Sequence, residues 1–370
     1  MMRKVKIGII GCGNISAAYL RTAQTFAILE VVALADIDLP RAGARALEFG
    51  VPTACSVPEL LANPEVEIAV NLTTPQAHLE VSLAAIAAGK HVYTEKPLAI
   101  TRAEGASILE AAIAKGVRLG CAPGTFIGGG LQTCRKLIDD GAIGRPVACS
   151  AFMMSHGAEH WHPDPAFLYQ VGAGPMFDMG PYYLTALTTL LGPITRVAGT
   201  VGIQISPRII TSKPKYGEKI IVNTPDHITG TFTFANGVIG TIITSSAVWN
   251  SMLPRIEIYG TEGTLSLPDP NSLGGPVHIS KAGSREWTEV PLTHGHADSH
   301  MMWGIGVADM AHALVSGRPH RASGNQGYHV LELMQAFLET SRDNQYAHLA
   351  STINQPQALP LGLPEDMLDD

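Results

Sequence analysis

Charge is scarce in this sequence. Asp, Glu, Lys and Arg make up 15% of the 370 residues, whereas hydrophobic residues make up 46%. An average soluble domain has about 25% charged residues. A chain with so little charge and so much apolar content can bury large cores, so extended disorder is excluded. The net charge is −7 and no stretch concentrates Lys and Arg, which argues against a DNA or RNA partner.

Long apolar runs are also lacking. No run reaches the roughly 20 apolar residues that cross a bilayer, so we expect no membrane association. The opening stretch MMRKVKIGIIGCGNIS is basic and then apolar, as a signal peptide is. Glycines interrupt this stretch, however, and Asn14 stands where small cleavage-site residues would be needed. We therefore interpret it as a first strand and expect a cytoplasmic protein.

Closely spaced cysteines are absent, because the five in the chain are Cys12, Cys55, Cys121, Cys134 and Cys149. This spacing is typical of reduced thiols rather than of a disulfide framework or a zinc site. His156 and His160 have the spacing at which one helix presents two imidazoles to zinc. Pro163 and Pro165 argue against a continuing helix there, and no acid or Cys lies at a clear spacing. No metal site is expected.

Residues 1–124 alternate strand-type and helix-type segments. The short apolar runs are VKIGIIG, EVVALAD, VEIAVNLTT, KHVYTE and GVRLGCA. The segments between them have recognisable helix ends, since Thr101 and Glu104 have capping-box spacing and Gly116 follows the last apolar position. Buried strands that alternate with helices predict a parallel, doubly wound sheet. The fold class is therefore α/β, with an N-terminal Rossmann dinucleotide-binding domain over 1–124.

The pattern changes after residue 124. Amphipathic helices are expected within 128–144, 178–192 and 326–343, and strand-type runs with ANG and TEG hairpin turns lie between the last two. This predicts a C-terminal α/β domain over 125–350 with a large, mainly antiparallel open sheet. Residues 351–370 are Pro-rich and acidic, and we expect a surface-lying or partly ordered tail. The stretch THGHADSH at 293–300, with His294, His296 and His300, is expected to be a solvated loop or, alternatively, a rim of the active site.

The first strand is followed by the glycine motif Gly11-Cys12-Gly13-Asn14-Ile15-Ser16. Gly11 permits a tight turn, Gly13 lets the backbone approach a pyrophosphate, and the helix N-terminus offers free N–H groups to the phosphates. A tight turn without a ligand would look similar, but Asp36 ends the second strand at the spacing of an acid that binds ribose hydroxyls. Because its carboxylate would repel a 2′-phosphate, NAD is favoured; Arg41 lies near enough in sequence to leave NADP possible.

Several motifs together resemble the Gfo/Idh/MocA oxidoreductases. They are the glycine motif, a T-x-P-x-x-H-type segment, Glu95-Lys96-Pro97, a G-x-x-x-D-x-G turn at 174–180, IEIYGTEGTL at 256–265 and GRP at 317–319. The resemblance implies a nicotinamide-dependent redox reaction on a sugar, cyclitol or related polyol. It also implies a homodimer or homotetramer, since the open sheet often forms the subunit interface. The cofactor-binding residues expected are Gly11, Gly13, Asn14, Ile15, Asp36, Thr73, Thr74, Pro75, His78, Glu95 and Lys96.

The stretch GPMFDMGPYYL at 174–184 carries part of the catalytic prediction. In the family that the chain resembles, the Lys of E-K-P reaches the reacting oxygen and the Lys–Pro bond is often cis, which carries over to Lys96 and Pro97. Many members have an Asp and, four residues later, a His that serves as acid/base. Here these positions hold Asp178 and Tyr182, and Tyr also occurs there in some branches. The resemblance therefore implies that Lys96, Asp178 and Tyr182 are catalytic.

The chemistry of these side chains is workable. Loss of hydride from an alcohol carbon requires removal of the hydroxyl proton, yet free Tyr and Lys have pKa values near 10. Lys96 beside Tyr182 would favour the phenolate, and Asp178 would favour a charged Lys96. Our hypothesis is that Asp178 holds Lys96, Lys96 polarises the oxygen and Tyr182 relays the proton. From the residues alone, Asp178 could equally be a helix cap and Tyr182 a half-buried aromatic residue.

Substrate contacts are expected from His156, His160, Trp161 and Tyr182, because imidazoles hydrogen-bond sugar hydroxyls and an indole can cover a sugar face. The stretch PGTFIGGGLQ at 123–132 replaces an Arg-containing segment of many relatives, so an anionic substrate is not supported. The sequence thus predicts an NAD-dependent dehydrogenase of a sugar, glycoside or cyclitol. Two alternatives stay open: an NAD-retaining enzyme that cleaves or epimerises glycosides by transient oxidation, and a non-catalytic NAD-sensing regulator.

Overall fold

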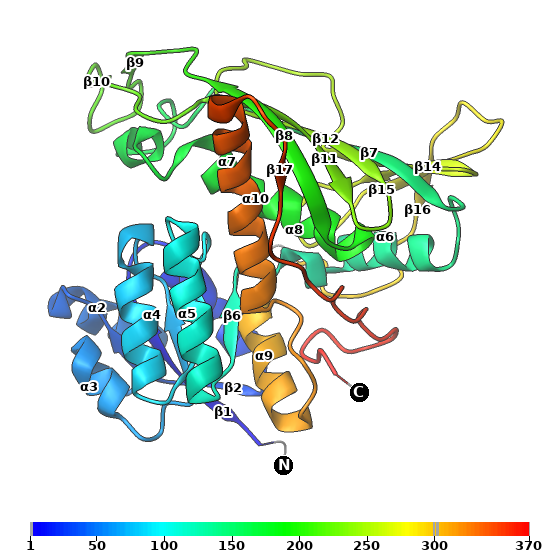
Figure 1. Ribbon diagram of the computed structural model, residues 1–370. Coiled ribbons are helices and arrows are strands. Elements are labelled where there is room, and N and C mark those ends of the chain that lie inside the picture. The colour runs from blue at the N-terminus through cyan, green and yellow to red at the C-terminus, as the bar shows by residue number, and fades with distance from the viewer. Residues whose placement is uncertain (1–2, 299, 301–302, 370) are drawn as a thin grey trace.

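Two sheets form the framework of the computed structural model, which describes residues 3–298, 300 and 303–369 (Figure 1). The first sheet is entirely parallel. Its strands lie in the order β3 (Ala54–Cys55), β2 (Leu29–Ala35), β1 (Val5–Ile10), β4 (Ile68–Asn71), β5 (His91–Thr94) and β6 (Leu119–Cys121). The parallel, doubly wound sheet predicted from the apolar runs is confirmed.

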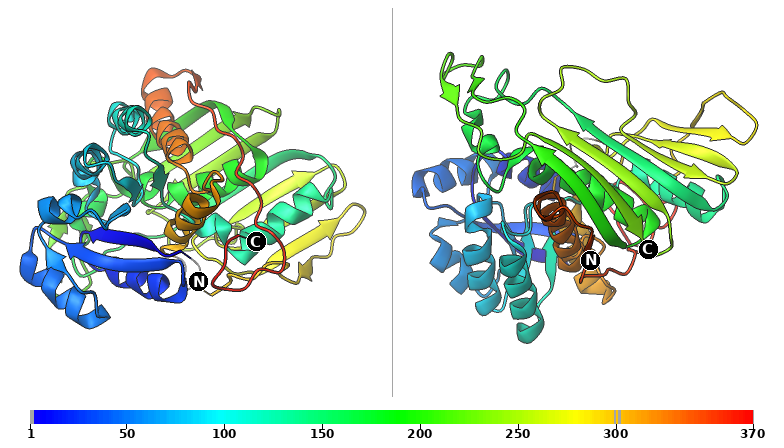
Figure 2. Two further views of the ribbon diagram at one scale, coloured as in Figure 1. Left: turned by 90° about the horizontal axis from the view of Figure 1, so that it is seen from below. Right: turned by 45° about the horizontal axis from the view of Figure 1, so that its top comes forward.

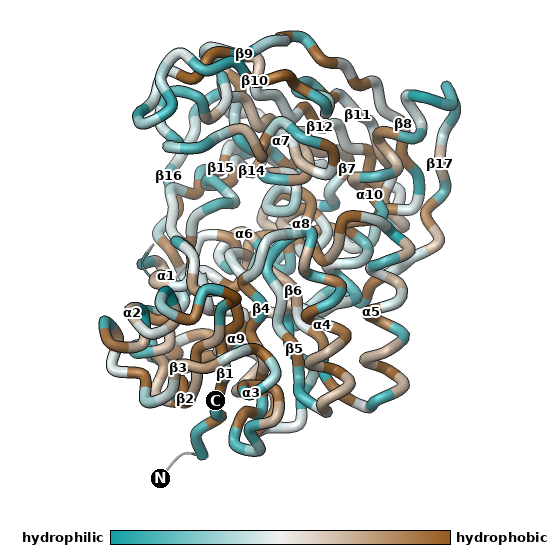
Figure 3. Tube along the Cα trace, turned by 90° about the vertical axis from the view of Figure 1, so that its left-hand side faces the viewer, coloured by the Kyte–Doolittle hydropathy of each residue, from teal (hydrophilic) through white to brown (hydrophobic). Residues whose placement is uncertain are grey.

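The helices of this half are α1 (Ser16–Thr25), α2 (Leu39–Phe49), α3 (Val57–Ala62), α4 (His78–Ala87) and α5 (Arg102–Lys115), with the 3₁₀ turn η1 (Pro75–Ala77) before α4. The predicted capping box at Thr101 and Glu104 is present, and Gly116 ends α5 in a left-handed conformation. Figure 3 shows hydrophobic residues concentrated around β1, β2 and β3. The strands are rich in apolar residues because helices cover both faces of a parallel sheet and bury its side chains.

The second sheet is mixed and mainly antiparallel, as predicted. Its strands lie in the order β16 (Thr288–Val290), β15 (Val277–Lys281), β14 (Gly263–Leu267), β13 (Ile256–Gly260), β7 (Pro146–Met154), β12 (Ile239–Ser245), β11 (His227–Phe234), β8 (Ile194–Gly202) and β17 (Ala347–His348). Neighbours run antiparallel except β7 and β12, which are parallel. A small separate hairpin joins β9 (Arg208–Ile209) to β10 (Lys219–Ile220).

Helices gather on one face of the second sheet, and Figure 2 shows its opposite face turned outward. They are α6 (Gly129–Asp139), α7 (Gly174–Asp178), α8 (Gly180–Leu191) and α10 (Gly324–Asp343), with the 3₁₀ turns η2 (Thr125–Ile127) and η3 (Pro165–Tyr169) nearby. Helix α10 packs closely, because a Cβ on Gly230 of β11 would lie 2.2 Å from the Phe337 ring. In Figure 1, α10 also crosses the junction between the two sheets. Helix α9 (Ile305–Ser316) returns to the first sheet beside β6.

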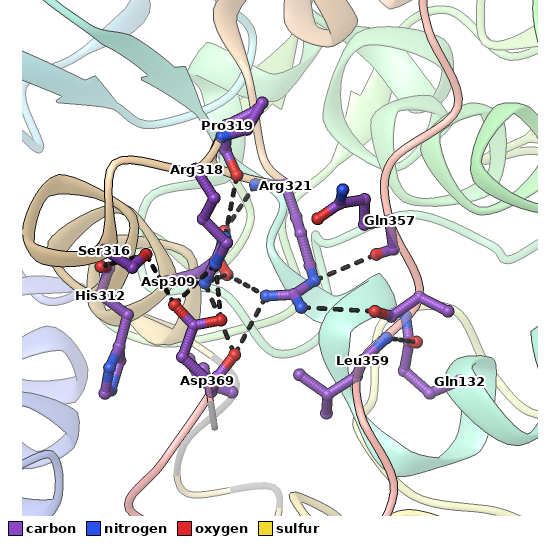
Figure 4. Close-up of polar contacts among 12 residues, drawn as sticks. Gln132, Asp309, His312, Ser316, Arg318, Pro319, Arg321, Gln357, Leu359 and Asp369 are labelled. Carbon is purple, nitrogen blue, oxygen red and sulfur yellow. Dashed lines mark hydrogen bonds and ion pairs between the residues drawn. The ribbon is translucent and has the colours of Figure 1, made fainter.

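The tail lies against helices rather than apart from them, although it contains no helix or strand over 349–369. Figure 4 shows how polar contacts hold it. The Leu359 N–H donates to Gln132 of α6 (2.7 Å), and the Arg321 side chain donates to the Gln357 carbonyl (3.0 Å). Arg318 pairs with Asp369 (2.7 Å) and with buried Asp309 of α9 (2.7 Å).

The prediction of a solvated loop at THGHADSH is wrong for its first histidines. His294 and His296 are buried. The His294 ring contacts the Leu359 carbonyl (3.0 Å), and the His296 N–H donates to Glu365 (2.7 Å). The tail therefore covers residues 294–296, although the polar composition of that segment favours a position in solvent. Ser299 of the same stretch lies outside the described residues. Among the described helices, none is both long and apolar enough to cross a membrane.

Candidate active site

The glycine turn after β1 leaves open space at the carboxyl edge of the first sheet. Gly11 has a φ of +99°, and a Cβ there would lie 2.7 Å from the Leu72 carbonyl carbon, so the turn requires glycine. A Cβ on Gly13 would meet nothing within 4 Å. Helix α1 begins without a side-chain cap, although the Ser16 and Ala18 N–H groups donate to the Gly13 and Ile15 carbonyls (3.2 and 3.0 Å). An anion would bind the other N–H groups of this turn. Asn14 is exposed and Ile15 half-buried beside this turn.

Asp36 is fixed at the same edge, where β2 ends. Its carboxylate accepts the backbone N–H of Cys12 (2.7 Å) and of Asp38 (2.9 Å). The Arg41 guanidinium lies 3.7 Å from it and also pairs with Asp38 (3.1 Å). An open glycine face beside an oriented carboxylate fits a dinucleotide: the helix N-terminus would hold its phosphates and Asp36 its ribose hydroxyls.

The segment after β4 is tied to the E-K-P segment by His78. Its Nδ1 lies 2.7 Å from the Pro97 carbonyl oxygen, and its Nε2 lies 3.1 Å from that of Thr73. His78 is fully buried, and burial lowers its pKa. Thr74 and Pro75 begin the turn η1. The structure therefore places His78 behind the edge, where it braces the backbone, whereas the threonines lie along the edge itself.

Glu95 and Lys96 follow β5. The Glu95 carboxylate accepts the Tyr19 hydroxyl of α1 (2.7 Å) and the Lys96 backbone N–H (2.9 Å). The Lys96–Pro97 bond is cis, as the resemblance implied. The E-K-P segment is thus anchored on both sides, which fixes the direction in which the Lys96 side chain leaves the backbone.

Lys96, Asp178 and Tyr182 come together between the two sheets. Lys96 Nζ donates to the Asp178 carboxylate (2.7 Å) and to the Asp178 carbonyl oxygen (2.7 Å). It also lies 5.5 Å from the centre of the Tyr182 ring. Burial lowers the pKa of Lys96, but Asp178, Tyr182 and Glu95 outweigh it, and its pKa lies above the ordinary value. Lys96 is therefore a charged donor rather than a base at neutral pH.

Tyr182 is a neutral phenol in this environment. Its side chain is buried at the start of α8, and burial raises its pKa to about 12 although Lys96 acts to lower it. Lys96 does favour the phenolate, as expected. Burial disfavours the phenolate more strongly, so the Tyr182 hydroxyl stays protonated at neutral pH. Tyr183 is fully buried on the same helix, with its hydroxyl 3.5 Å from Arg255.

The expected substrate residues lie in the loop after β7. His156 stacks on Trp249 with ring centres 3.4 Å apart, and Trp161 packs edge-on against His162. His160 and Trp161 are exposed. Among the described residues, no hydrogen bond, ion pair or aromatic contact joins this loop directly to Lys96 or Tyr182. Across all residues that the structure describes, no group of three or more His, Cys, Asp or Glu side chains is placed to hold a metal ion.

Sequence reasoning missed three residues of this region. Tyr19 holds Glu95, Trp303 lines the same small cavity as Tyr182, and Arg208 is buried beneath the substrate loop. Arg208 pairs with Glu159 (2.6 Å) and Asp226 (2.9 Å) and donates to the His156 carbonyl (2.9 Å). All three act across long sequence separations, so no local motif points to them.

Comparisons with known proteins identify relatives of this chain. Residues 5–122 match the family model of an oxidoreductase family with an NAD-binding Rossmann fold, and residues 131–266 match the GFO/IDH/MocA C-terminal domain. An inositol 2-dehydrogenase of Pseudomonas fluorescens is 38% identical over 306 residues, which is 77% of this chain and 81% of that protein. A levoglucosan dehydrogenase of Pseudarthrobacter phenanthrenivorans is 24% identical, over 92% of this chain and 97% of that protein.

A similar fold is found in solved structures. One is a levoglucosan dehydrogenase in complex with NADH and L-sorbose, with a TM-score of 0.82 at 22% identity, covering 94% of this chain and 99% of the other. The glycine turn, the E-K-P segment, the Lys96–Asp178 pair and both family matches lead to one conclusion: the chain belongs to the Gfo/Idh/MocA family of NAD-binding oxidoreductases.

Proposed function

We propose that the protein transfers a hydride between NAD and a hydroxyl-bearing carbon of a sugar, glycoside or cyclitol. The observation that carries this proposal is the charged Lys96, held by Asp178 and lying over the Tyr182 ring. Relatives named for inositol, levoglucosan and 1,5-anhydro-D-fructose support a polyol substrate. NAD rather than NADP is favoured by Asp36, because its carboxylate, held beside the glycine turn by the Cys12 N–H, would repel a 2′-phosphate.

Lys96 binds and polarises the reacting oxygen in this proposal. An ammonium group has three N–H donors, and two of them go to Asp178. The third is directed to the substrate oxygen, where a fixed positive charge stabilises the alkoxide that forms as the hydroxyl proton leaves. Asp178 keeps Lys96 charged and oriented.

Tyr182 exchanges the proton of the same oxygen. As a buried phenol it is a proton donor for carbonyl reduction. In the oxidative direction its own proton must first pass to solvent, and the phenolate then accepts the proton of the substrate hydroxyl. When bound, NAD would supply the hydride acceptor, and Lys96 favours the phenolate of Tyr182 that accepts the proton. The pair thus separates two tasks, electrostatic stabilisation by Lys96 and proton transfer by Tyr182.

His156, His160 and Trp161 form the expected substrate loop. Its base is rigid, because Glu159 is held by Arg208 and Tyr169 below the surface, whereas Trp161 is 63% exposed. An exposed indole beside imidazoles suits a ring with several hydroxyls and an apolar face. We further propose a cytoplasmic homodimer or homotetramer that associates through the outward face of the second sheet.

A substrate screen tests this function. Purified protein is mixed with NAD or NADP and a panel of sugars, glycosides and inositols while NADH absorbance is followed. Nucleotide released by denaturation is identified in parallel. Net NADH formation with one substrate group supports the proposal and names the class. Substrate consumption without net NADH, together with a co-purified nucleotide, would replace it by the NAD-retaining alternative.

A further inference from the structure

One side chain of α10 holds the backbone that follows the E-K-P segment. The Gln335 Nε2 donates to the Ile100 carbonyl (2.6 Å), and the Gln335 Oε1 accepts the Arg102 backbone N–H (3.1 Å). The Arg102 N–H can only donate and the Ile100 carbonyl can only accept, so the orientation of the amide is determined. Because both ends of one planar amide are used, Gln335 fixes the position and the direction of this backbone.

The backbone that Gln335 holds leads directly to Lys96. Ile100 lies four residues after Lys96, and residues 97–99 between them are buried. A Cβ on Gly327 of α10 would lie 3.7 Å from the Leu98 Cβ, so α10 also packs against the middle of this link. A short, buried link therefore transmits the position set at Ile100 to the backbone of Lys96.

Helix α10 also holds α8, which belongs to the other half of the candidate site. The Gln326 side chain donates to the Thr189 hydroxyl of α8 (2.9 Å), and both residues are buried. A Cβ on Gly180, which lies between the proposed catalytic residues of α7 and α8, would lie 3.7 Å from the Met334 sulfur. Figure 1 shows α10 at the junction of the two sheets. One helix thus holds both the link to Lys96 and the start of α8.

We propose that Gln335 is a positioning residue for Lys96: its amide sets the backbone after the E-K-P segment against α10, so that the Lys96 ammonium reaches Asp178 and the reacting oxygen together. This inference rests on the proposed function, in which Lys96 stabilises the alkoxide. The Lys96 Nζ lies 2.7 Å from the Asp178 carboxylate. If the backbone shifts, the flexible lysine side chain can keep its contact with Asp178 or its direction to the substrate oxygen, but not both.

Gln335→Met tests the inference, because Met keeps the length of the side chain and makes neither hydrogen bond. Since a displacement of about 1 Å at a reacting group can cost about 10²-fold, we expect kcat in the oxidative direction to fall roughly 3- to 30-fold. The value of kcat/KM for the sugar should fall by the same factor, because Lys96 acts mainly in the transition state. NAD affinity, measured by titration, should stay within about twofold, because the nucleotide residues lie apart from Gln335. Gln345→Met, at an exposed position just beyond α10, is the matched control and should behave as wild type.

The same substitution in a Lys96→Met background shows whether Gln335 acts through Lys96. A loss of kcat in Gln335→Met that gives no further loss in the double variant supports the inference, because the two residues then act as a unit. An equal loss in both backgrounds contradicts it. An unchanged kcat in Gln335→Met together with a lowered urea midpoint also contradicts it, since Gln335 would then only stabilise the fold.

Failure of the proposed function would look different. Near-wild-type turnover of Lys96→Met would overturn the role of Lys96 and this inference with it, whereas the outcomes above overturn only the role of Gln335. If Gln335→Met does not fold, as circular dichroism would show, Gln335→Glu decides, because its carboxylate accepts the Arg102 N–H but cannot donate to Ile100. A reduced kcat that is absent from the Lys96→Met background supports the inference, and a wild-type kcat contradicts it.

Discussion

At the scale of single residues, Tyr182 is the side chain whose loss should slow the chemical step while leaving cofactor binding nearly unchanged. Tyr182→Phe removes only the buried hydroxyl beside Lys96. Because general acid–base catalysis contributes on the order of 10²–10⁴ in rate, we expect kcat to fall by about that factor. Steady-state kinetics with saturating NAD would measure it, and the KM for NAD should change little. Tyr183→Phe, one position along the same helix, is the control and should keep most of its activity.

The same residues show what local sequence information can and cannot provide. The resemblance pointed to Lys96 in the E-K-P segment and to Asp178 and Tyr182. The four-residue spacing suggested one helical face for the last two, which is wrong, because Asp178 ends α7 and Tyr182 lies in α8. That Tyr182 shares a small cavity with Trp303 and Tyr19 was not readable, because these residues belong to separate elements. The burial that raises the pKa of Tyr182 is likewise a property of the packed site and has no trace in the spacing.

At the scale of elements, Arg208 organises the end of the second sheet. Its side chain is fully buried between Glu159 and Asp226 and also donates to the Ser246 carbonyl (2.7 Å). Arg208→Met would leave two buried carboxylates without their cation, which typically costs about 3–5 kcal/mol. Urea unfolding should show a loss of this size. Arg342→Met, in an exposed pair with Asp343, should lose less than about 1 kcal/mol.

Equal losses in the two arginine variants would contradict the assignment of Arg208 as the organising residue. A second readout is available, because a loosened substrate loop should raise the KM for the sugar more than it lowers kcat.

His329 links α10 to the start of β8 and to the tail, and it predicts a pH dependence of stability. Its ring accepts the Ile194 N–H (3.1 Å) and lies 2.7 Å from the Ser351 hydroxyl. Burial lowers its pKa from 6.5 to about 4, although nearby Glu332 opposes this. Between these values the unfolded chain binds the proton and the folded chain does not, so stability is full above pH 6.5 and falls toward pH 4.

The expected loss from His329 is about 3 kcal/mol over that range. His329→Gln keeps a hydrogen-bonding group but cannot titrate, so its unfolding free energy should fall less steeply between pH 6.5 and 4. Urea unfolding at several pH values would measure both slopes. Identical slopes in wild type and variant would show that His329 does not govern this dependence.

Several elements could be predicted from the sequence because their signal is local. The apolar runs of the first sheet, the capping box of α5 and the hairpin β11–β12 are of this kind. Helix α9 was missed, since residues 305–313 are buried on every side and show no amphipathic pattern. Strands β3, β9, β10 and β17 have two residues each, too few for a periodic pattern. His294 and His296 were misassigned because the residues that cover them lie more than 60 positions away.

At the scale of the whole molecule, the outward face of the second sheet is the predicted subunit interface. Ile239 of β12 is 60% exposed on that sheet. We expect Ile239→Glu to shift the mass measured by light scattering toward the monomer, because a charge would be buried in the interface. Ile113→Glu, at an exposed position of α5 in the first domain, is the matched control. An unchanged mass in both variants would place the interface elsewhere or leave the protein a monomer.

The two sheets meet where the chemistry is proposed. Lys96 comes from the end of β5, Asp178 and Tyr182 from α7 and α8, and Trp303 from the approach to α9. A site assembled from both halves of the chain acts only when the halves are held together, which is the structural role of α10 and the anchored tail (Figures 1 and 4). The domain boundaries predicted at residues 124 and 350 remain predictions, because α9 and α10 pack on both halves.

The most direct test of the central claim is NADH formation by Lys96→Met with the substrate found in the screen. Because Lys96 supplies the fixed charge at the reacting oxygen, we predict a loss in kcat of at least about 10²–10³ with NAD still bound. Lys136→Met, at a surface ion pair on α6, should match wild type. Turnover by Lys96→Met at a rate close to that of wild type would contradict the account, since no other described lysine lies at this site.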